Sequence, residues 1–223
     1  MMARFKLIPI ALVMAAAFFS SSSALAGTYH FDCVGGSGCS FVLNAGAITY
    51  SATEEPVIAC SSQTGSGSVT NGSSFGEMST TVQGCKMTVF GITIQCQSTG
   101  APSGVISFGK FPIHLIHLEP QRTTPGVLYT LPTTTLTCSS FIKIELTGNG
   151  LIGDVTESCN TSSTNFHVDF SATQGVQRWR QITTAGTFFD LRYDTEDDQR
   201  WGTVGVTAND VLTWTNLVKL TCT

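Results

Sequence analysis

The segment 72–76, with the sequence GSSFG, matches the G-x-S-x-G pattern that carries the nucleophilic serine of many hydrolases. Asp154 and His167 follow Ser74 in the chain order that such a catalytic triad requires. The pattern needs a helix after the serine, because a sharp strand-to-helix turn exposes the hydroxyl group. Residues 77–82 are instead typical of a strand. We therefore interpret the segment as a structural turn, and a secreted hydrolase acting on polysaccharide or ester substrates is the alternative.

Two other groups of residues have the composition of a metal site. His114 and His117 form an H-x-x-H pair, but the apolar residues around them are typical of a strand, on which positions three apart face opposite sides. Asp194, Glu196 and Asp198 have the spacing of a calcium loop without the later Gly and Glu of an EF-hand. We interpret this acidic run as the solvated tip of a hairpin, with a weak calcium site as the alternative. No metal or cofactor is expected.

Aromatic and guanidinium side chains gather near the end of the chain in a pattern that suits a binding surface. An exposed strip of this kind can stack sugar rings or anchor a protein partner. The alternative is a core tryptophan covered by an arginine in a cation–π pair, and Trp214 belongs to the same group of aromatic residues. The residues of the candidate strip are Arg178, Trp179, Tyr193, Arg200 and Trp201.

The first 26 residues have the layout of a secretory signal peptide. Arg4 and Lys6 precede an apolar run, and the segment ends in Ala24-Leu25-Ala26, an A-x-A cleavage site. The apolar run is too short to span a bilayer as a helix, and no later segment approaches that length, so no transmembrane span is expected after cleavage. The full chain carries a formal net charge of −4 and lacks a basic stripe, which excludes nucleic acid as a partner.

The cysteines support an extracellular location. An even number behind a signal peptide predicts four disulfides rather than a zinc site, and no C-x-x-C pair is present. Sequence proximity favours the pairs Cys33–Cys39, Cys85–Cys96 and Cys138–Cys159, which leaves Cys60–Cys222. The eight cysteines are Cys33, Cys39, Cys60, Cys85, Cys96, Cys138, Cys159 and Cys222.

The remaining sequence predicts an all-β fold. Residues 86–95 alternate with a bend or bulge at Gly91, residues 141–146 and 165–172 alternate as well, and residues 211–222 form a long strand candidate. Turn signals lie between such segments, among them Asn71-Gly72 and Asn209-Asp210. Residues 61–74 are the most loop-like stretch, although residues 68–70 inside it also suit strand pairing. We expect a single domain over residues 27–223, an antiparallel sandwich or flattened barrel with disulfides, and a β-solenoid is the alternative.

The chain resembles secreted Thr- and Gly-rich proteins of high-GC Gram-positive bacteria that have no assigned function. The resemblance covers residues 48–222 and rests on strand and turn signatures, so it implies a bacterial, extracellular setting and no active-site residue. The segments that carry it are SATE at 51–54, ACSS at 59–62, GSG at 65–67, GC at 84–85, PIHL at 112–115, PGVL at 125–128 and GNGLIG at 148–153.

These features predict a secreted, non-enzymatic binding or structural module at the cell surface, and the hydrolase described above is the alternative. A cell-wall glycan or a surface protein is the expected partner. The two classes differ in one respect, since a hydrolase needs Ser, His and carboxylate groups, or two carboxylates, that converge in a pocket.

Overall fold

The computed structural model describes residues 29–52, 57–116, 118–119, 125–138, 142–148, 150–171, 180–181, 191–195 and 202–222. The predicted signal peptide lies outside these ranges. In the part of the chain that is described, no helix has the length and hydropathy needed to cross a membrane.

Eight antiparallel strands close into a barrel, which confirms the all-β prediction in its barrel form and not as a solenoid. Each strand pairs with the next around the ring, and the last pairs with the first, so the sheet closes on itself. In ring order the strands are β2 (Gly38–Ala45), β5 (Ser62–Thr70), β6 (Phe75–Gln83), β10 (Val105–Ile116), β12 (Gly126–Tyr129), β15 (Leu151–Val155), β16 (Ser162–Ser171) and β19 (Gly202–Cys222).

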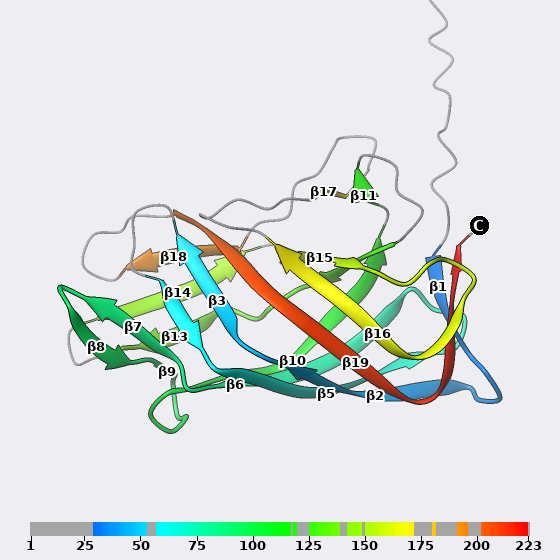
Figure 1. Ribbon diagram of the computed structural model, residues 1–223, viewed down its shortest axis with the longest axis horizontal. Helices are drawn as coiled ribbons and strands as arrows, with labels where there is room; N and C mark the ends of the chain where they lie inside the picture. The colour runs from blue at the N-terminus through cyan, green and yellow to red at the C-terminus, as the bar shows by residue number, and fades with distance from the viewer. Residues whose placement is uncertain are drawn as a thin grey trace, which may run out of the picture.

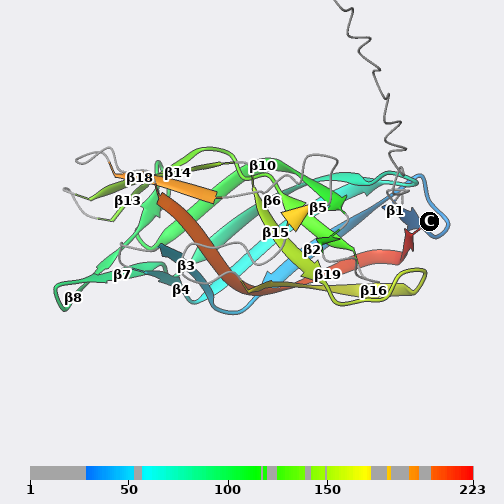
Figure 2. The same cartoon turned by 90° about the horizontal axis from the view of Figure 1, so that it is seen from above.

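Further strands extend the barrel at both ends, and the molecule is therefore longer than it is wide (Figure 1). Seen from above, β7, β8, β13, β14 and β18 gather at one end and β1 at the other (Figure 2). Their bounds are β1 (Tyr29–Cys33), β3 (Ile48–Ala52), β4 (Ile58–Cys60), β7 (Lys86–Val89), β8 (Ile92–Gln95), β9 (Gln97–Ser98), β13 (Thr134–Thr137), β14 (Lys143–Gly148) and β18 (Leu191–Thr195). A separate two-stranded sheet joins β11 (Leu118–Glu119) to β17 (Arg180–Gln181).

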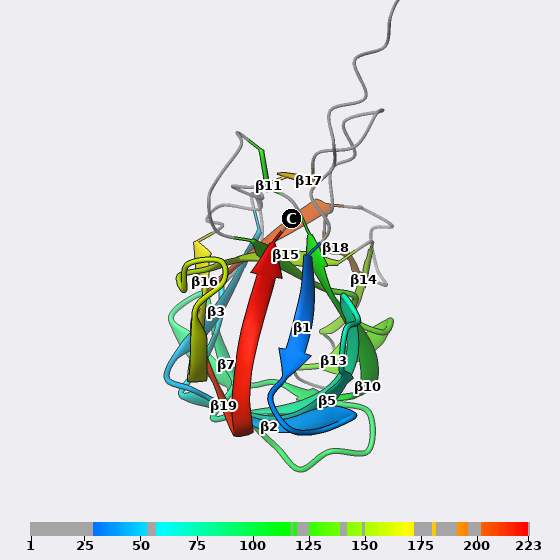
Figure 3. The same ribbon diagram turned by 90° about the vertical axis from the view of Figure 1, so that its right-hand side faces the viewer.

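Strand β19 organises the fold, because different parts of its length pair with β1, β2, β3, β16 and β18. Figure 3 shows its C-terminal part beside β1 at one end of the barrel. The expected turn at Asn209-Asp210 is wrong: both residues lie inside this strand, and Asp210 pairs with Ala45 of β2. The loop-like interpretation of residues 61–74 is also wrong for most of its length, since β5 covers Ser62–Thr70, which includes the three residues expected to suit strand pairing.

Alternating side chains fill the interior, as the period of two predicts. Phe166, Val168 and Phe170 of β16 are buried, whereas His167 between them is exposed. Trp214 is 3% exposed, and its ring centroid lies 4.7 Å from that of Phe41. Of the tryptophans considered for a binding strip, Trp214 therefore belongs to the core.

Four disulfides confirm the predicted oxidised state, and they indicate an oxidising environment. The pair Cys33–Cys39 is the one expected, but the other three predicted pairs are wrong. The observed pairs are Cys60–Cys85, Cys96–Cys138 and Cys159–Cys222. The cause is strand order: β4 pairs with β7, which places Cys60 next to Cys85 although 25 residues separate them in sequence.

Candidate binding surface

The interior of the barrel is packed with side chains, so the described residues enclose no chamber for an organic ligand. The internal cavity lined by Tyr50, Gln63, Tyr129 and Asp210 has a volume of about 20 Å³. Sites for small organic molecules usually measure about 300–1,000 Å³. A ligand of that size must therefore bind on the outside of the described barrel.

The same cavity contains a buried carboxyl group. Asp210 is 1% exposed, and burial raises its pKa to about 7, while the nearby Tyr129 hydroxyl acts in the opposite direction. Gln63 Oε1 is buried without a hydrogen-bond partner in the described protein, whereas the Tyr129 hydroxyl lies close enough to the Asp210 carboxyl to affect its pKa. Burial also raises the pKa of Tyr129 well above its usual value. Because all three residues point into the core, this group bears on stability rather than on contact with a ligand.

The outer face of β2, β5 and β6 carries a shallow groove of about 410 Å³, which we call the hydroxyl groove. Successive residues of a strand face opposite sides, so the outward positions of β5 present Ser66 and Ser68 while Gly67 faces the core. The residues that line the groove are Ser40, Phe41, Val42, Ser66, Gly67, Ser68, Glu77, Met78, Ser79, Lys110 and Thr215.

A second hollow continues the hydroxyl groove toward an exposed aromatic ring. Ser68 and Glu77 line both hollows, so the two hollows adjoin along β5 and β6, and we call them together the trough. Phe75, at the start of β6, is 55% exposed and lines the second hollow. Its ring centroid lies 4.1 Å from that of His114 in an edge-to-face arrangement. The imidazole therefore supports one side of the phenyl ring at the end of the trough.

The trough is rich in free hydroxyl groups and carries little net charge. The structure records no hydrogen bond within the described protein for the side chains of Ser66, Ser68 or Ser79, so these groups are available to a ligand. The charged groups are Glu77 and Lys110, whose Oε2 and Nζ atoms lie 3.7 Å apart. Both are mostly exposed, and an ion pair of this kind contributes little to stability.

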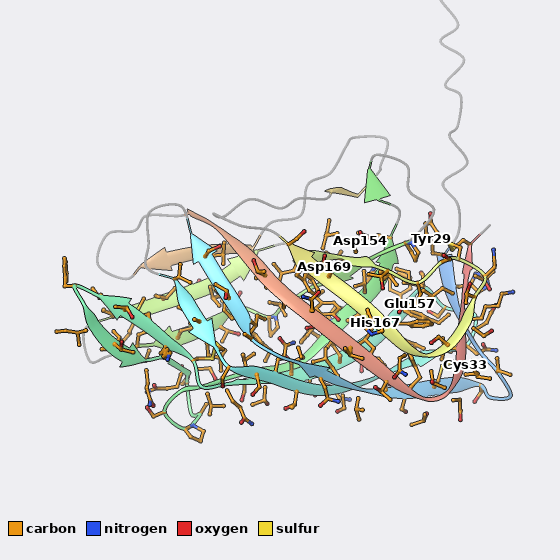
Figure 4. The ribbon with its side chains drawn as sticks, viewed as in Figure 1. Tyr29, Cys33, Asp154, Glu157, His167 and Asp169 are labelled. Atoms are coloured by element: carbon orange, nitrogen blue, oxygen red, sulfur yellow. A yellow bond between two sulfur atoms is a disulfide. The ribbon has the colours of Figure 1, made fainter. Side chains whose placement is uncertain are left out.

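A histidine–carboxylate pair lies on a different part of the surface, at the β15–β16 connection (Figure 4). His167 Nδ1 is 2.6 Å from Glu157 Oε1, and the same carboxylate accepts the His167 backbone N–H. The Thr156 N–H also donates to the His167 carbonyl, so these bonds close the connection between the strands. Asp154 and Asp169 are paired positions on the same two strands. The hydrogen bonds of His167 with Glu157 and Thr156 therefore hold the β15–β16 connection against β16.

The structure does not assemble the triad that the hydrolase alternative would need. Ser74 is followed by strand β6 and not by a helix, as the turn interpretation predicts, and its carbonyl accepts the Leu115 N–H. Among the described residues, the structure records a partnership of His167 with Glu157 and none with Ser74. The side chains that come together are therefore those of His167 and Glu157, which link the β15–β16 connection to β16.

Other predicted site residues lie partly or wholly outside the described ranges. His114 lies on β10, where partial burial lowers its pKa, but His117 is not described. The described residues contain no cluster of three metal-ligating side chains. Asp194 lies in β18, whereas Glu196 and Asp198 are not described. In the aromatic strip, Tyr193 lies on β18, and Arg178, Trp179, Arg200 and Trp201 fall outside the described residues.

Sequence reasoning missed the hydroxyl groove because it took residues 61–74 as the most loop-like stretch and recognised strand character only at residues 68–70. A signal was nevertheless present: in residues 62–69, hydroxyl-bearing residues alternate with Gln, Gly and Val. That period of two is a strand pattern in which glycine takes the inward positions. Asp210 was missed for a similar reason, since Asn-Asp is a common turn signal.

The fold and its outer trough define a class: a disulfide-bonded, closed eight-stranded antiparallel barrel with an external rather than internal candidate site. Comparisons with protein-family models, curated proteins and solved structures found no match. The resemblance to secreted Thr- and Gly-rich bacterial proteins therefore stays a prediction.

Proposed function

We propose that this protein is a secreted, non-enzymatic binding module that recognises a neutral glycan at a cell surface through the hydroxyl groove. The four disulfides support an oxidising location, and the predicted signal peptide supports export. The proposal keeps the class of function that the sequence favours, but it assigns binding to a different surface from the aromatic and arginine strip.

The observation that carries the proposal is the composition of the trough. Each serine hydroxyl can both donate and accept a hydrogen bond, as can each hydroxyl of a sugar. Glu77 can accept bonds from two neighbouring sugar hydroxyls, and Lys110 can donate. Because the two charges are opposite, the trough favours a neutral ligand over a strongly acidic or basic one.

Phe75 supplies the apolar contact that polar groups alone cannot. The flat face of a sugar ring exposes C–H groups, and an exposed aromatic ring can pack against it. The edge-on contact with His114 restrains the Phe75 ring, so less conformational freedom is lost when a ligand binds. A glycan lying along the trough would contact Phe75 at one end and the serines of β5 further along.

A glycan-array screen tests this proposal with wild-type protein and the Ser68→Trp variant, in which a bulky ring fills the centre of the trough. Thr64→Trp is the matched control, because Thr64 is exposed on the same strand and is not a lining residue of the groove. We expect neutral glycans to bind the wild type and the control but not Ser68→Trp. Equal binding by all three proteins would place the site elsewhere, and hydrolysis of the bound glycan would favour the enzyme alternative.

A further inference from the structure

The hairpin formed by β7 and β8 projects at one end of the molecule (Figures 1 and 2). Its turn carries exposed apolar side chains. The sequence predicts a bend or bulge at Gly91. In the structure, Phe90 and Gly91 are instead the two residues of a hairpin turn. Phe90 is 101% exposed and Ile92 is 67% exposed. We call Val89, Phe90 and Ile92 the apolar tip.

The backbone at the tip is unfavourable for phenylalanine. Phe90 has φ of 50° and Gly91 has φ of 79°, so both residues occupy the left-handed region. A two-residue hairpin turn of this kind normally takes Asn-Gly or Asp-Gly, because bulky side chains disfavour positive φ. The ring of Phe90 gains no burial that offsets this disadvantage. A strained residue that contributes nothing to the core is a candidate for a functional contact.

The two faces of the hairpin differ in polarity. One face runs from buried Met87 through Ile94 to Ile92, so apolar side chains continue from the core to the tip. On the opposite face, the hydroxyls of Thr88 and Thr93 are 3.3 Å apart. The apolar face of the hairpin is thus buried near its base and becomes exposed toward the turn.

Disulfides fix both strands at the base of the hairpin. Cys85 and Cys96 are each 0% exposed, and the Cys96 N–H donates to the Cys85 carbonyl at 3.0 Å. Cys85 is bonded to Cys60 and Cys96 to Cys138, so each strand is tied to a different part of the fold. The tip is therefore preorganised, and little conformational entropy is lost on binding.

The charge of the hairpin and the small apolar area of its tip indicate what the tip contacts. The hairpin, residues 86–95, contains one charged side chain, Lys86, and no acidic residue, whereas the whole chain has a net charge of −4. Lys86 lies on the polar face near the base of the hairpin. A stable protein interface buries about 1,200–2,000 Å², far more than one phenylalanine and its neighbours supply. A bilayer surface needs no complementary pocket and attracts a lysine when it contains anionic lipid.

The geometry points to a lipid contact: the apolar tip inserts Phe90 and Ile92 into the boundary between headgroups and acyl chains, with Lys86 at the level of anionic headgroups. This inference is independent of the glycan proposal, because it uses another end of the molecule. The barrel would then approach the membrane end-on, and the hydroxyl groove on its side would stay accessible.

Co-sedimentation of the oxidised full-length protein with vesicles tests the inference. The probes are vesicles of phosphatidylcholine alone and vesicles that also contain phosphatidylglycerol. Phe90→Asn removes the ring and suits the turn better, so it should fold at least as stably as the wild type. Leu217→Asn is the matched control, since Leu217 is an apolar side chain, 48% exposed, outside both the hairpin and the trough. We expect the wild type and the control to bind the anionic vesicles and Phe90→Asn to bind at least tenfold more weakly.

Two further measurements make the result decisive. Lys86→Gln should weaken binding to the anionic vesicles and leave binding to phosphatidylcholine unchanged. Sedimentation velocity without lipid tests a second copy of the chain as the occupant of the tip. Failure of the wild type to bind either vesicle, or equal binding by Phe90→Asn, would overturn the inference. A change from dimer to monomer in Phe90→Asn would overturn it in favour of self-association.

Discussion

Gly67 on β5 lies directly against the ring of Phe41 on β2. A Cβ atom added at Gly67 would stand 2.3 Å from Phe41 Cζ and 2.5 Å from the Glu77 carbonyl oxygen. Ser66 and Ser68, on either side of Gly67, face the hydroxyl groove. Because Gly67 has no side chain, the Phe41 ring packs directly against β5 on the inner side, while Ser66 and Ser68 of the same strand face the groove on the outer side.

Gly67→Ala should be destabilising, because the new methyl group cannot fit without moving the Phe41 ring and the β6 backbone. Overpacking of this kind typically costs about 1–3 kcal/mol. Gly109→Ala is the control, since a Cβ at Gly109 would meet no atom within 4 Å. Chemical denaturation should show a lower free energy of unfolding for Gly67→Ala than for the control. Equal values for the two variants would contradict the close approach of β5 to Phe41.

Asp210 should make stability depend on pH. The unfolded chain ionises this carboxyl near the ordinary pKa of 3.8, whereas the folded protein keeps it protonated to about 7. The folded state then binds more protons in that interval, so its free energy of unfolding falls as pH rises from about 4 to about 7. The loss from this one group is about 4 kcal/mol at most.

The Asp210→Asn variant isolates this contribution, because an amide has a similar size and does not ionise. Denaturation of wild type and variant at several pH values should give a difference in unfolding free energy that changes in favour of the variant toward pH 8. A constant difference across that range would mean that Asp210 does not titrate in the folded barrel as described. Other carboxylates affect both proteins alike and cancel in the comparison.

The disulfides should contribute unequally to stability. In the chain-entropy model, a bridge that closes a longer loop constrains the unfolded chain more strongly. Cys159–Cys222 spans 63 residues and Cys33–Cys39 spans 6. Replacing both cysteines of the longer bridge by serine should therefore cost about 2 kcal/mol more than the same change at the shorter one.

Thermal and chemical unfolding of the two double-serine variants checks this order. Peptide mapping of the unreduced protein provides the control, since it must recover Cys60–Cys85 and Cys96–Cys138 in both variants. A greater loss from Cys33→Ser/Cys39→Ser would show that native contacts at that bridge outweigh loop entropy.

Local sequence predicted the local parts of this structure. The alternation of Phe166, Val168 and Phe170 correctly gave a half-buried strand, and Asn71-Gly72 correctly marked a turn, with Gly72 at φ of 73°. Cysteine count correctly gave four disulfides. Each of these features depends on neighbours in sequence or on composition alone.

Features that depend on strand order could not be predicted in the same way. Cys60 meets Cys85 because β4 pairs with β7, and no local pattern specifies that pairing. The polar residue Asp210 lies within a long strand because β2 and β16 pair with both sides of β19 there. The hydroxyl groove likewise appears only when β2, β5 and β6 are placed side by side.

Calorimetric titration with a neutral oligosaccharide chosen from the array measures directly whether the trough binds a glycan. The proteins are wild type, the triple variant Ser66→Ala/Ser68→Ala/Ser79→Ala, Phe75→Ala and the control Phe90→Ala, which removes an exposed ring away from the groove. We predict saturable binding by the wild type and Phe90→Ala, with at least tenfold weaker binding by the triple variant and by Phe75→Ala. Unchanged affinity in both groove variants, or no neutral oligosaccharide that binds the wild type, would contradict the account.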